Sequence, residues 1–126
     1  MSWRNSEAAE RMAERRRREE EAPRLNVTIP TLEKLRLEVE ERSASISRPE
    51  HTHTRHVVVS SAPALFVMPC RDTQCKDGGH NLTAEILSAL RRRVERFEGT
   101  DACGGNVGSA SCARVLAYVG VASYHN

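Results

Sequence analysis

Hydrophobic and charged residues alternate in the stretch that opens the apolar part of the chain. Leu35, Leu37 and Val39 take every second position there, so a strand would place all three on one face. A helix beginning at Thr31 is an alternative interpretation, because Leu32, Leu35 and Val39 also have helical spacing. The strict alternation favours the strand.

A β-branched run follows at residues 57–68 and is broken at Pro63. It predicts one bent strand or two strands in series, with Pro63 at an edge or a bulge. Before this run, His51 and His53 share one face of an extended chain, and His56 takes the other. The three histidines invite a second metal site, but an exposed strand edge is the favoured interpretation.

A helix is predicted at residues 82–98 from an apolar stripe at steps of three and four residues. The stripe consists of Leu82, Ile86, Leu87, Leu90, Val94 and Phe97. Asn81 or Thr83 can cap the first turn, and Gly99 is a natural stop. The last predicted strand is residues 113–124, which carry apolar side chains on both faces and therefore fit the centre of a sheet.

The order strand, strand, helix, strand predicts an α+β fold. We expect residues 25–126 to form a small, mostly antiparallel sheet of three or four strands, packed on the one amphipathic helix and stapled by a metal site. Residues 1–24 precede this domain as a charged arm. Because residues 1–22 contain six arginines and six glutamates but no continuous apolar face, we expect a helix that is flexible or is ordered by a partner.

The composition fits one small domain. A core built from a chain of 126 residues leaves a narrow margin of stability, which a metal ion can supplement. The balance of 19 basic against 17 acidic residues, a net charge of +2, does not by itself mark a nucleic-acid-binding protein. No signal-peptide pattern or membrane-length apolar segment is visible, so the expected compartment is the cytoplasm, with no membrane partner.

Four cysteines form two close pairs on either side of the predicted helix, Cys70 with Cys75 and Cys103 with Cys112. A cytoplasmic protein keeps its thiols reduced, so the pairs favour a metal site over two disulfides in an exported protein. Four thiolates can close a tetrahedral shell around zinc, which is the predicted cofactor. His80 could replace one cysteine as a ligand, or lie beside the ligands or on the surface.

An iron–sulfur cluster is the alternative cofactor. In residues 66–118, a strand ending in Cys70, a second cysteine at Cys75, an arginine-rich helix and a glycine-flanked Cys103 resemble the thioredoxin-like [2Fe–2S] ferredoxins. This resemblance implies an electron carrier with a [2Fe–2S] cluster. The chain departs from the family pattern because eight residues separate Cys103 from Cys112, where the family has a close-set pair. The aromatic-proline pattern after the last cysteine is also missing.

Enzymatic activity is not expected from this set of residues. A shell closed by four thiolates leaves no position for a reacting water. A nucleophilic cysteine with His80 as its base is conceivable, but it leaves the other three cysteines unexplained.

Two sets of arginines are candidate contacts for a nucleic-acid backbone or an acidic partner. The first set lies in the arm and consists of Arg15, Arg16, Arg17 and Arg18, and the second lies late in the predicted helix and consists of Arg91, Arg92, Arg93 and Arg96. A solubilising tail and a solvated helix face are the alternative interpretations. Base-specific recognition is not implied, because the chain has few aromatic residues.

The expected function is that of a small zinc-binding adaptor or binding module on RNA, DNA or a ribonucleoprotein machine. The arm is expected to have a protein partner, and no small-molecule substrate is expected. The alternatives are the ferredoxin-type electron carrier and a structural protein–protein interaction module without nucleic acid.

Overall fold

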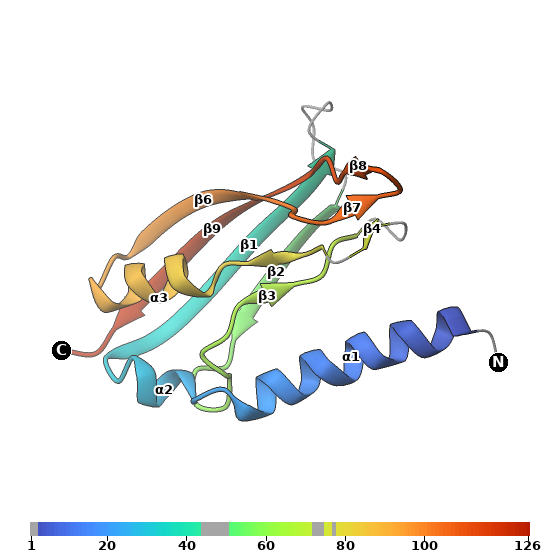
Figure 1. Cartoon of the computed structure of the whole chain (residues 1–126). Coiled ribbons are helices and arrows are strands. Elements are labelled where there is room, and N and C mark those ends of the chain that lie inside the picture. The colour runs from blue at the N-terminus through green and yellow to red at the C-terminus, as the bar shows by residue number, and fades with distance from the viewer. Residues whose placement is uncertain (1–2, 44–50, 72–74, 77) are drawn as a thin grey trace.

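The computed structural model describes residues 3–43, 51–71, 75–76 and 78–126. Three helices and nine strands are assigned in these residues (Figure 1). In chain order they are α1 (Trp3–Glu21), α2 (Leu25–Thr28), β1 (Leu32–Ser43), β2 (His51–Val57), β3 (Val67–Met68), β4 (Cys75–Lys76), β5 (His80–Asn81), α3 (Thr83–Arg91), β6 (Arg96–Ala102), β7 (Asn106–Val107), β8 (Ala110–Ser111) and β9 (Arg114–Tyr124).

The main sheet has four strands in the order β2-β1-β9-β6, and each neighbouring pair is antiparallel. This confirms the predicted α+β fold with a small antiparallel sheet. It also confirms the central position of the last strand and the exposed edge formed by the histidine-containing strand. Two small ribbons, β3-β5 and β4-β7-β8, complete the strand pairing.

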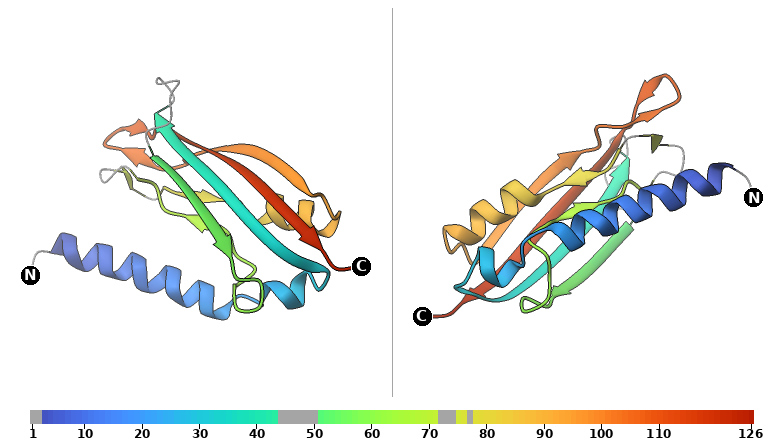
Figure 2. Two further views of the ribbon diagram at one scale, coloured as in Figure 1. Left: turned by 180° about the vertical axis from the view of Figure 1, so that it is seen from behind. Right: turned by 60° about the horizontal axis from the view of Figure 1, so that its bottom comes forward.

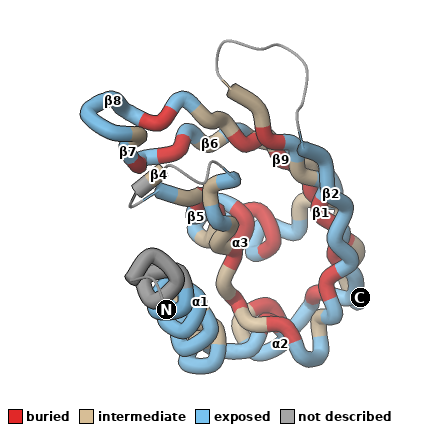
Figure 3. The backbone as a smooth tube through the Cα atoms, turned by 90° about the vertical axis from the view of Figure 1, so that its right-hand side faces the viewer, coloured by how far each residue is buried: buried red, intermediate tan, exposed pale blue. Residues whose placement is uncertain are grey.

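All three helices lie on the same side of the main sheet. Figure 3 shows β6, β9, β1 and β2 forming a curved wall with α1, α2 and α3 on its inner side, and Figure 2 shows the same layering from two other directions. Leu35 and Leu37 of β1 point to this inner side and are buried, so the predicted alternation is confirmed and the alternative helix is wrong. They pack in one cluster with Ile86 and Leu90 of α3.

The predicted helix was too long, because α3 ends at Arg91 instead of residue 98. Arg93 adopts a left-handed conformation with φ of 58°, a conformation that costs a non-glycine residue about 1–3 kcal/mol. Its N–H donates to the Leu90 carbonyl, and the Val94 N–H donates to the Ala89 carbonyl, both at 3.1 Å. These bonds close the helix as a glycine cap would do.

The side chain of Arg93 accounts for this unusual helix end. Its guanidinium donates to the carbonyl of His125 at 3.0 Å and lies 5.3 Å from the centre of the Tyr124 ring. The end of α3 is thereby bound to the end of the chain. Sequence spacing alone cannot show such a contact between distant residues. At the start of α3 the N-cap is Leu82, so neither Asn81 nor Thr83 caps the helix as predicted, although Asn81 Oδ1 accepts a hydrogen bond from the Thr83 N–H at 3.1 Å.

Phe97 and Gly99, assigned to the helix and its stop from the sequence, instead belong to β6. In the register between β6 and β9, Phe97 is opposite Gly120 and Gly99 is opposite Tyr118. A Cβ atom added at Gly120 would overlap the Phe97 ring, and one added at Gly99 would come within 2.6 Å of the Tyr118 hydroxyl. Each aromatic ring therefore occupies the space above a glycine in the neighbouring strand.

The run of residues 57–68 was predicted to be one bent strand or two strands in series, but residues 58–66 form no strand and only the two ends of the run do. Residue Val57 ends β2, a turn follows, and the strand structure resumes at Val67. Pro63 forms an isolated antiparallel bridge with Arg24, outside the main sheet. This position is compatible with a residue that has no N–H to donate.

The arm contains the helix α1, and main-chain bonds fix the chain directly after it. Pro23 accepts from the Ala64 N–H at 2.8 Å, and the Leu25 N–H donates to the Ala62 carbonyl at 2.9 Å. The division into an arm of residues 1–24 and a domain of residues 25–126 stays a prediction. No helix in the described ranges combines the length and apolar character that a membrane span requires.

Replacing Gly120 by alanine is expected to destabilise the protein, because the added methyl group would displace the Phe97 ring from its place over β9. We expect the free energy of unfolding to fall by about 1–3 kcal/mol, measured by urea denaturation. Ser123→Ala, on the outer side of the same strand, serves as the control and should change the value little. Equal stability of Gly120→Ala and the native chain would contradict the proposed ring packing.

Candidate metal centre

The four cysteines are carried by four separate segments that meet near one end of the main sheet. Cys70 follows β3, and Cys75 opens β4. Cys103 follows β6, and the β7-β8 hairpin leads the chain to Cys112. Short main-chain bonds fix the last two, since the Cys103 N–H donates to the Arg114 carbonyl at 2.9 Å and the Cys112 N–H donates to Gly105 at 2.8 Å.

The four sulfur atoms lie within 4.8 Å of one another, and none of them is in a disulfide. The Cys75 and Cys103 sulfurs are 3.6 Å apart, and those of Cys70 and Cys112 are 3.7 Å apart. A tetrahedral shell with metal–sulfur bonds of about 2.3 Å has edges of about 3.8 Å. The described residues therefore contain a group of four thiols that could hold one metal ion, as the sequence predicted.

Backbone donors favour the ionised form of one of these thiols. Burial alone would raise the pKa of Cys103, but the N–H groups of Gly105 and Gly79 donate to its sulfur at 3.5 Å and 3.3 Å, and the pKa is lowered. Burial raises the pKa of Cys75 to about 11, and hydrogen bonding to Cys103 adds to the increase. The Cys75 thiol therefore keeps its proton, whereas two N–H groups stabilise the thiolate of Cys103. A bound metal ion would stabilise both thiolates with its own positive charge.

Glycine is required where the chain passes closest to the sulfurs. A Cβ atom at Gly78 would overlap the Cys75 sulfur and would lie 2.5 Å from the Cys103 sulfur. Gly79 has φ of 139°, a conformation that side chains rarely permit, and it directs its N–H to Cys103. By contrast, a Cβ atom at Gly104 would meet no atom within 4 Å.

His80 is not a member of this group of ligand atoms, which consists of cysteines alone in the part of the chain that the structure describes. The side chain is buried rather than exposed, and its Nδ1 lies 2.9 Å from a carboxylate oxygen of Asp101. Its Nε2 has no hydrogen-bond partner among the described residues, and a carboxylate oxygen of Glu41 lies 3.9 Å away from it. His80 therefore belongs to a polar cluster beside the cysteines.

Glu41 is the other buried member of that cluster, with 4% of its surface exposed. One of its carboxylate oxygens accepts from the Arg71 main-chain N–H and from the Arg114 side chain, both at 3.1 Å. Arg71 directly follows the first cysteine, Asp101 lies two residues before the third, and Arg114 lies two residues after the fourth. The Glu41–His80 cluster thus holds three of the four cysteine segments in position.

Sequence reasoning missed Glu41, although a signal was present. The alternation of β1 places Leu35, Leu37 and Val39 on the inner side, and Glu41 is the next residue of that series. A carboxylate at a core position of a strand requires charged or hydrogen-bonding partners.

The two predicted arginine sets lie on different elements and do not form one surface. Arg91 and Arg92 are exposed at the end of α3, and Arg96 is exposed on β6 instead of on the helix. Arg93 is also exposed, but its guanidinium is engaged by the end of the chain. The arm set, Arg15, Arg16, Arg17 and Arg18, lies in α1, where Arg17 pairs with Glu14.

Comparison of the chain with protein-family models, with curated proteins and with solved structures finds no match.

Gly78→Ala is expected to weaken metal binding, because its methyl group would push apart two of the sulfur atoms. We expect the affinity for zinc, measured by competition with a chromogenic chelator, to fall about 10–100-fold. Gly104→Ala is the matched control in the adjoining loop, where a methyl group meets no neighbour, and it should bind zinc as the native chain does. Equal zinc affinity of the two variants would argue against this arrangement of the sulfurs.

Proposed function

We propose that Cys70, Cys75, Cys103 and Cys112 bind one zinc ion with a structural role, in a protein that acts as a binding module and not as an enzyme. The observation that carries this proposal is the convergence of four thiols within 4.8 Å. Four sulfur ligands complete the tetrahedral shell that structural zinc sites use, and they leave no open position for substrate or water.

The sulfur spacing favours a single ion over the [2Fe–2S] alternative. A [2Fe–2S] cluster binds its cysteines on two different irons, so the two pairs of sulfurs stand further apart than the ligands of one ion. No two of the four sulfur atoms are more than 4.8 Å apart, which suits one ion at their centre. Zinc is favoured among single ions because it combines thiolate ligands with tetrahedral geometry.

A structural role is supported by the shortness of the strands around the site. The strands β4, β7 and β8 each contain two residues, and such short pairings contribute little stability of their own. An ion bound by all four segments would close these loops onto the end of the main sheet. The free energy of zinc binding would thus contribute directly to folding.

Metal analysis of protein purified without added metal tests the proposal, and we expect about one zinc per chain. Removal of zinc by a chelator under reducing conditions should lower the urea midpoint of unfolding, because the four segments lose their common ligand. Cys103→Ser should have the same effect, whereas Ser111→Ala, at an exposed neighbouring position, should retain zinc and stability. Stoichiometric iron and sulfide in a coloured protein would replace this proposal with the electron carrier.

The partner that we propose is the phosphate backbone of RNA or DNA, alone or within a ribonucleoprotein. Arg91 and Arg92 are exposed at the end of α3, and Arg96 follows on the neighbouring strand. Guanidinium groups bind phosphate with two hydrogen bonds and no base preference. The arm can add further contacts through Arg16, Arg17 and Arg18, which are exposed on α1.

The double variant Arg92→Gln/Arg96→Gln tests this surface with a single-stranded RNA homopolymer as the probe. We expect weaker binding and a salt dependence whose slope falls by roughly one unit for each lost phosphate contact. The variant should keep its zinc and its urea midpoint. Arg11→Gln, which removes one charge outside both arginine sets, measures the effect of one unit of net charge, half of the change in the double variant.

If the slope and affinity of the double variant equal those of the native chain, the second arginine set has no role in nucleic-acid binding. Absence of salt-dependent RNA or DNA binding by the native chain would favour an interaction module for proteins.

A further inference from the structure

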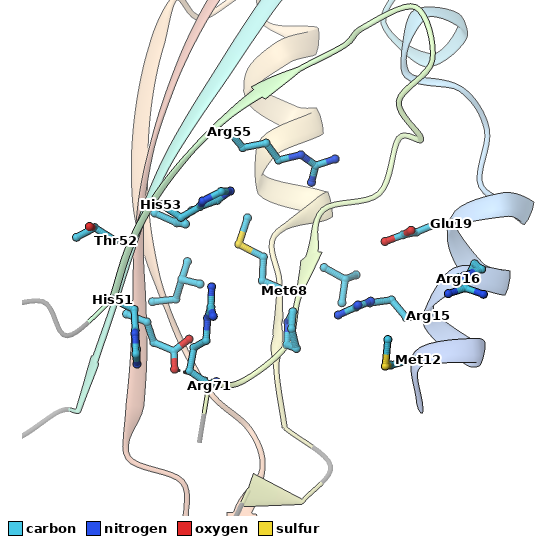
Figure 4. Close-up of a pocket in the computed structure, with 15 residues that line it drawn as sticks. Met12, Arg15, Arg16, Glu19, His51, Thr52, His53, Arg55, Met68 and Arg71 are labelled. Atoms are coloured by element: carbon cyan, nitrogen blue, oxygen red, sulfur yellow. Dashed lines mark hydrogen bonds between the residues drawn. The ribbon is translucent and has the colours of Figure 1, made fainter. Parts of the chain in front are cut away.

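A cavity of about 330 Å³ lies between α1 and the inner side of the main sheet, at the edge formed by β2. Its walls come from α1, β1, β2, β3 and β9 and from the segment that follows β3 (Figure 4). Small-molecule sites in proteins have volumes of about 300–1,000 Å³, so the cavity is large enough for a small organic ligand. It is separate from the group of four sulfurs, because no cysteine lines it.

Four arginines from three parts of the chain line this cavity. Arg15 and Arg16 come from α1, Arg55 comes from β2, and Arg71 follows the first cysteine. Figure 4 shows the side chains of Arg15 and Arg55 extending from opposite walls into the space between α1 and β2. Within the described ranges, none of the four guanidiniums forms an ion pair with a carboxylate.

The acidic groups in the cavity wall do not balance these charges. They are Glu19 and Glu41, and the Glu41 carboxylate already accepts hydrogen bonds from the Arg71 main chain and the Arg114 side chain. His51 and His53 also line the cavity from β2. The cavity therefore has an excess of positive charge, which favours an anion.

The remaining wall is aliphatic. Met68 lies near the middle of the cavity in Figure 4, and Val39, Val67 and Leu116 line it from three strands. Met12 adds a further apolar group from α1 and is 54% exposed on the helix. Such a surface binds an apolar ligand body by removing it from water.

We propose that this cavity binds a small organic anion with an aliphatic body, namely an alkyl carboxylate or an alkyl phosphate monoester. Its head group would lie between Arg15, Arg55 and Arg71, where two or more guanidiniums can donate hydrogen bonds to its oxygens. Its aliphatic chain would lie against Met68 and the neighbouring apolar residues.

A nucleic acid fits this cavity less well. No Phe, Tyr or Trp is among the residues that line it, so an unpaired base would find only the small imidazole rings of His51 and His53 on which to stack. The site is distinct from the second arginine set, which lies on α3 and β6. No small-molecule substrate was expected from the sequence, because only the folded chain brings the arginines of α1 to the same cavity as Arg55 and Arg71.

Titration calorimetry of the zinc-loaded full chain tests the proposal, with octanoate and octyl phosphate as probes below the concentrations at which they form micelles. We expect saturable binding of at least one probe, and the stronger of the two identifies the head group as carboxylate or phosphate. Affinity should rise about fourfold for each methylene between butanoate and octanoate, because each one buries further apolar surface. Inorganic phosphate and octanol, which each lack one half of the ligand, should bind at least about tenfold more weakly.

The variants Arg55→Gln and Arg71→Gln should each lower the affinity for the stronger probe about tenfold, through loss of a charge-assisted hydrogen bond. Arg36→Gln is the matched control, because Arg36 is exposed on the outer side of β1, opposite to the cavity. Three results would each overturn the proposal. They are octanol binding as tightly as octanoate, equal affinities of the three arginine variants, and the absence of saturable binding of both probes. None of these outcomes depends on nucleic-acid binding, so the two proposals fail separately.

Discussion

The convergence of four sulfur atoms within 4.8 Å is the constraint on which this end of the molecule depends. The cysteines stand on segments that are separated by up to 42 residues along the chain, and the strands beside three of them have only two residues each. Two-residue ribbons bury too little surface to hold four thiols in contact by themselves. A bound ion, as proposed, would resolve this by replacing thiol protons with a common positive charge.

A second constraint lies directly beside the sulfurs, in the buried pair of Glu41 and His80. Removing a carboxylate from water is unfavourable unless partners replace the lost hydration, and Glu41 obtains them from Arg71 and Arg114. His80 obtains one from Asp101. Because these partners adjoin three of the cysteines, the positions of the thiols and of the buried charges depend on each other.

The sequence predicted the parts of the fold that local spacing determines. The alternation in β1 and the apolar length of β9 each depend on residues close together in the chain. The short sulfur contacts instead join Cys75 with Cys103 and Cys70 with Cys112, across the two pairs that the sequence shows. The end of α3 could not be predicted in this way, because it depends on the contact of Arg93 with His125, which directly follows β9. The same holds for Phe97, whose helical spacing from Val94 concealed its strand pairing with Gly120. The cluster of Arg15 and Arg55 was missed because it requires the packing of α1 beside β2.

The metal centre and the cavity share one segment of the chain, and this connects the two proposals physically. Met68 and Arg71 line the cavity, and Cys70 lies between them in the sequence. The Arg71 main chain is bound in turn to Glu41, which contacts the cavity and the buried cluster. An ion held by Cys70 would therefore also restrict where the Arg71 guanidinium can lie. Since a coupling free energy between two sites acts in both directions, an anion held by Arg71 would equally stabilise the segment that supplies the first sulfur ligand.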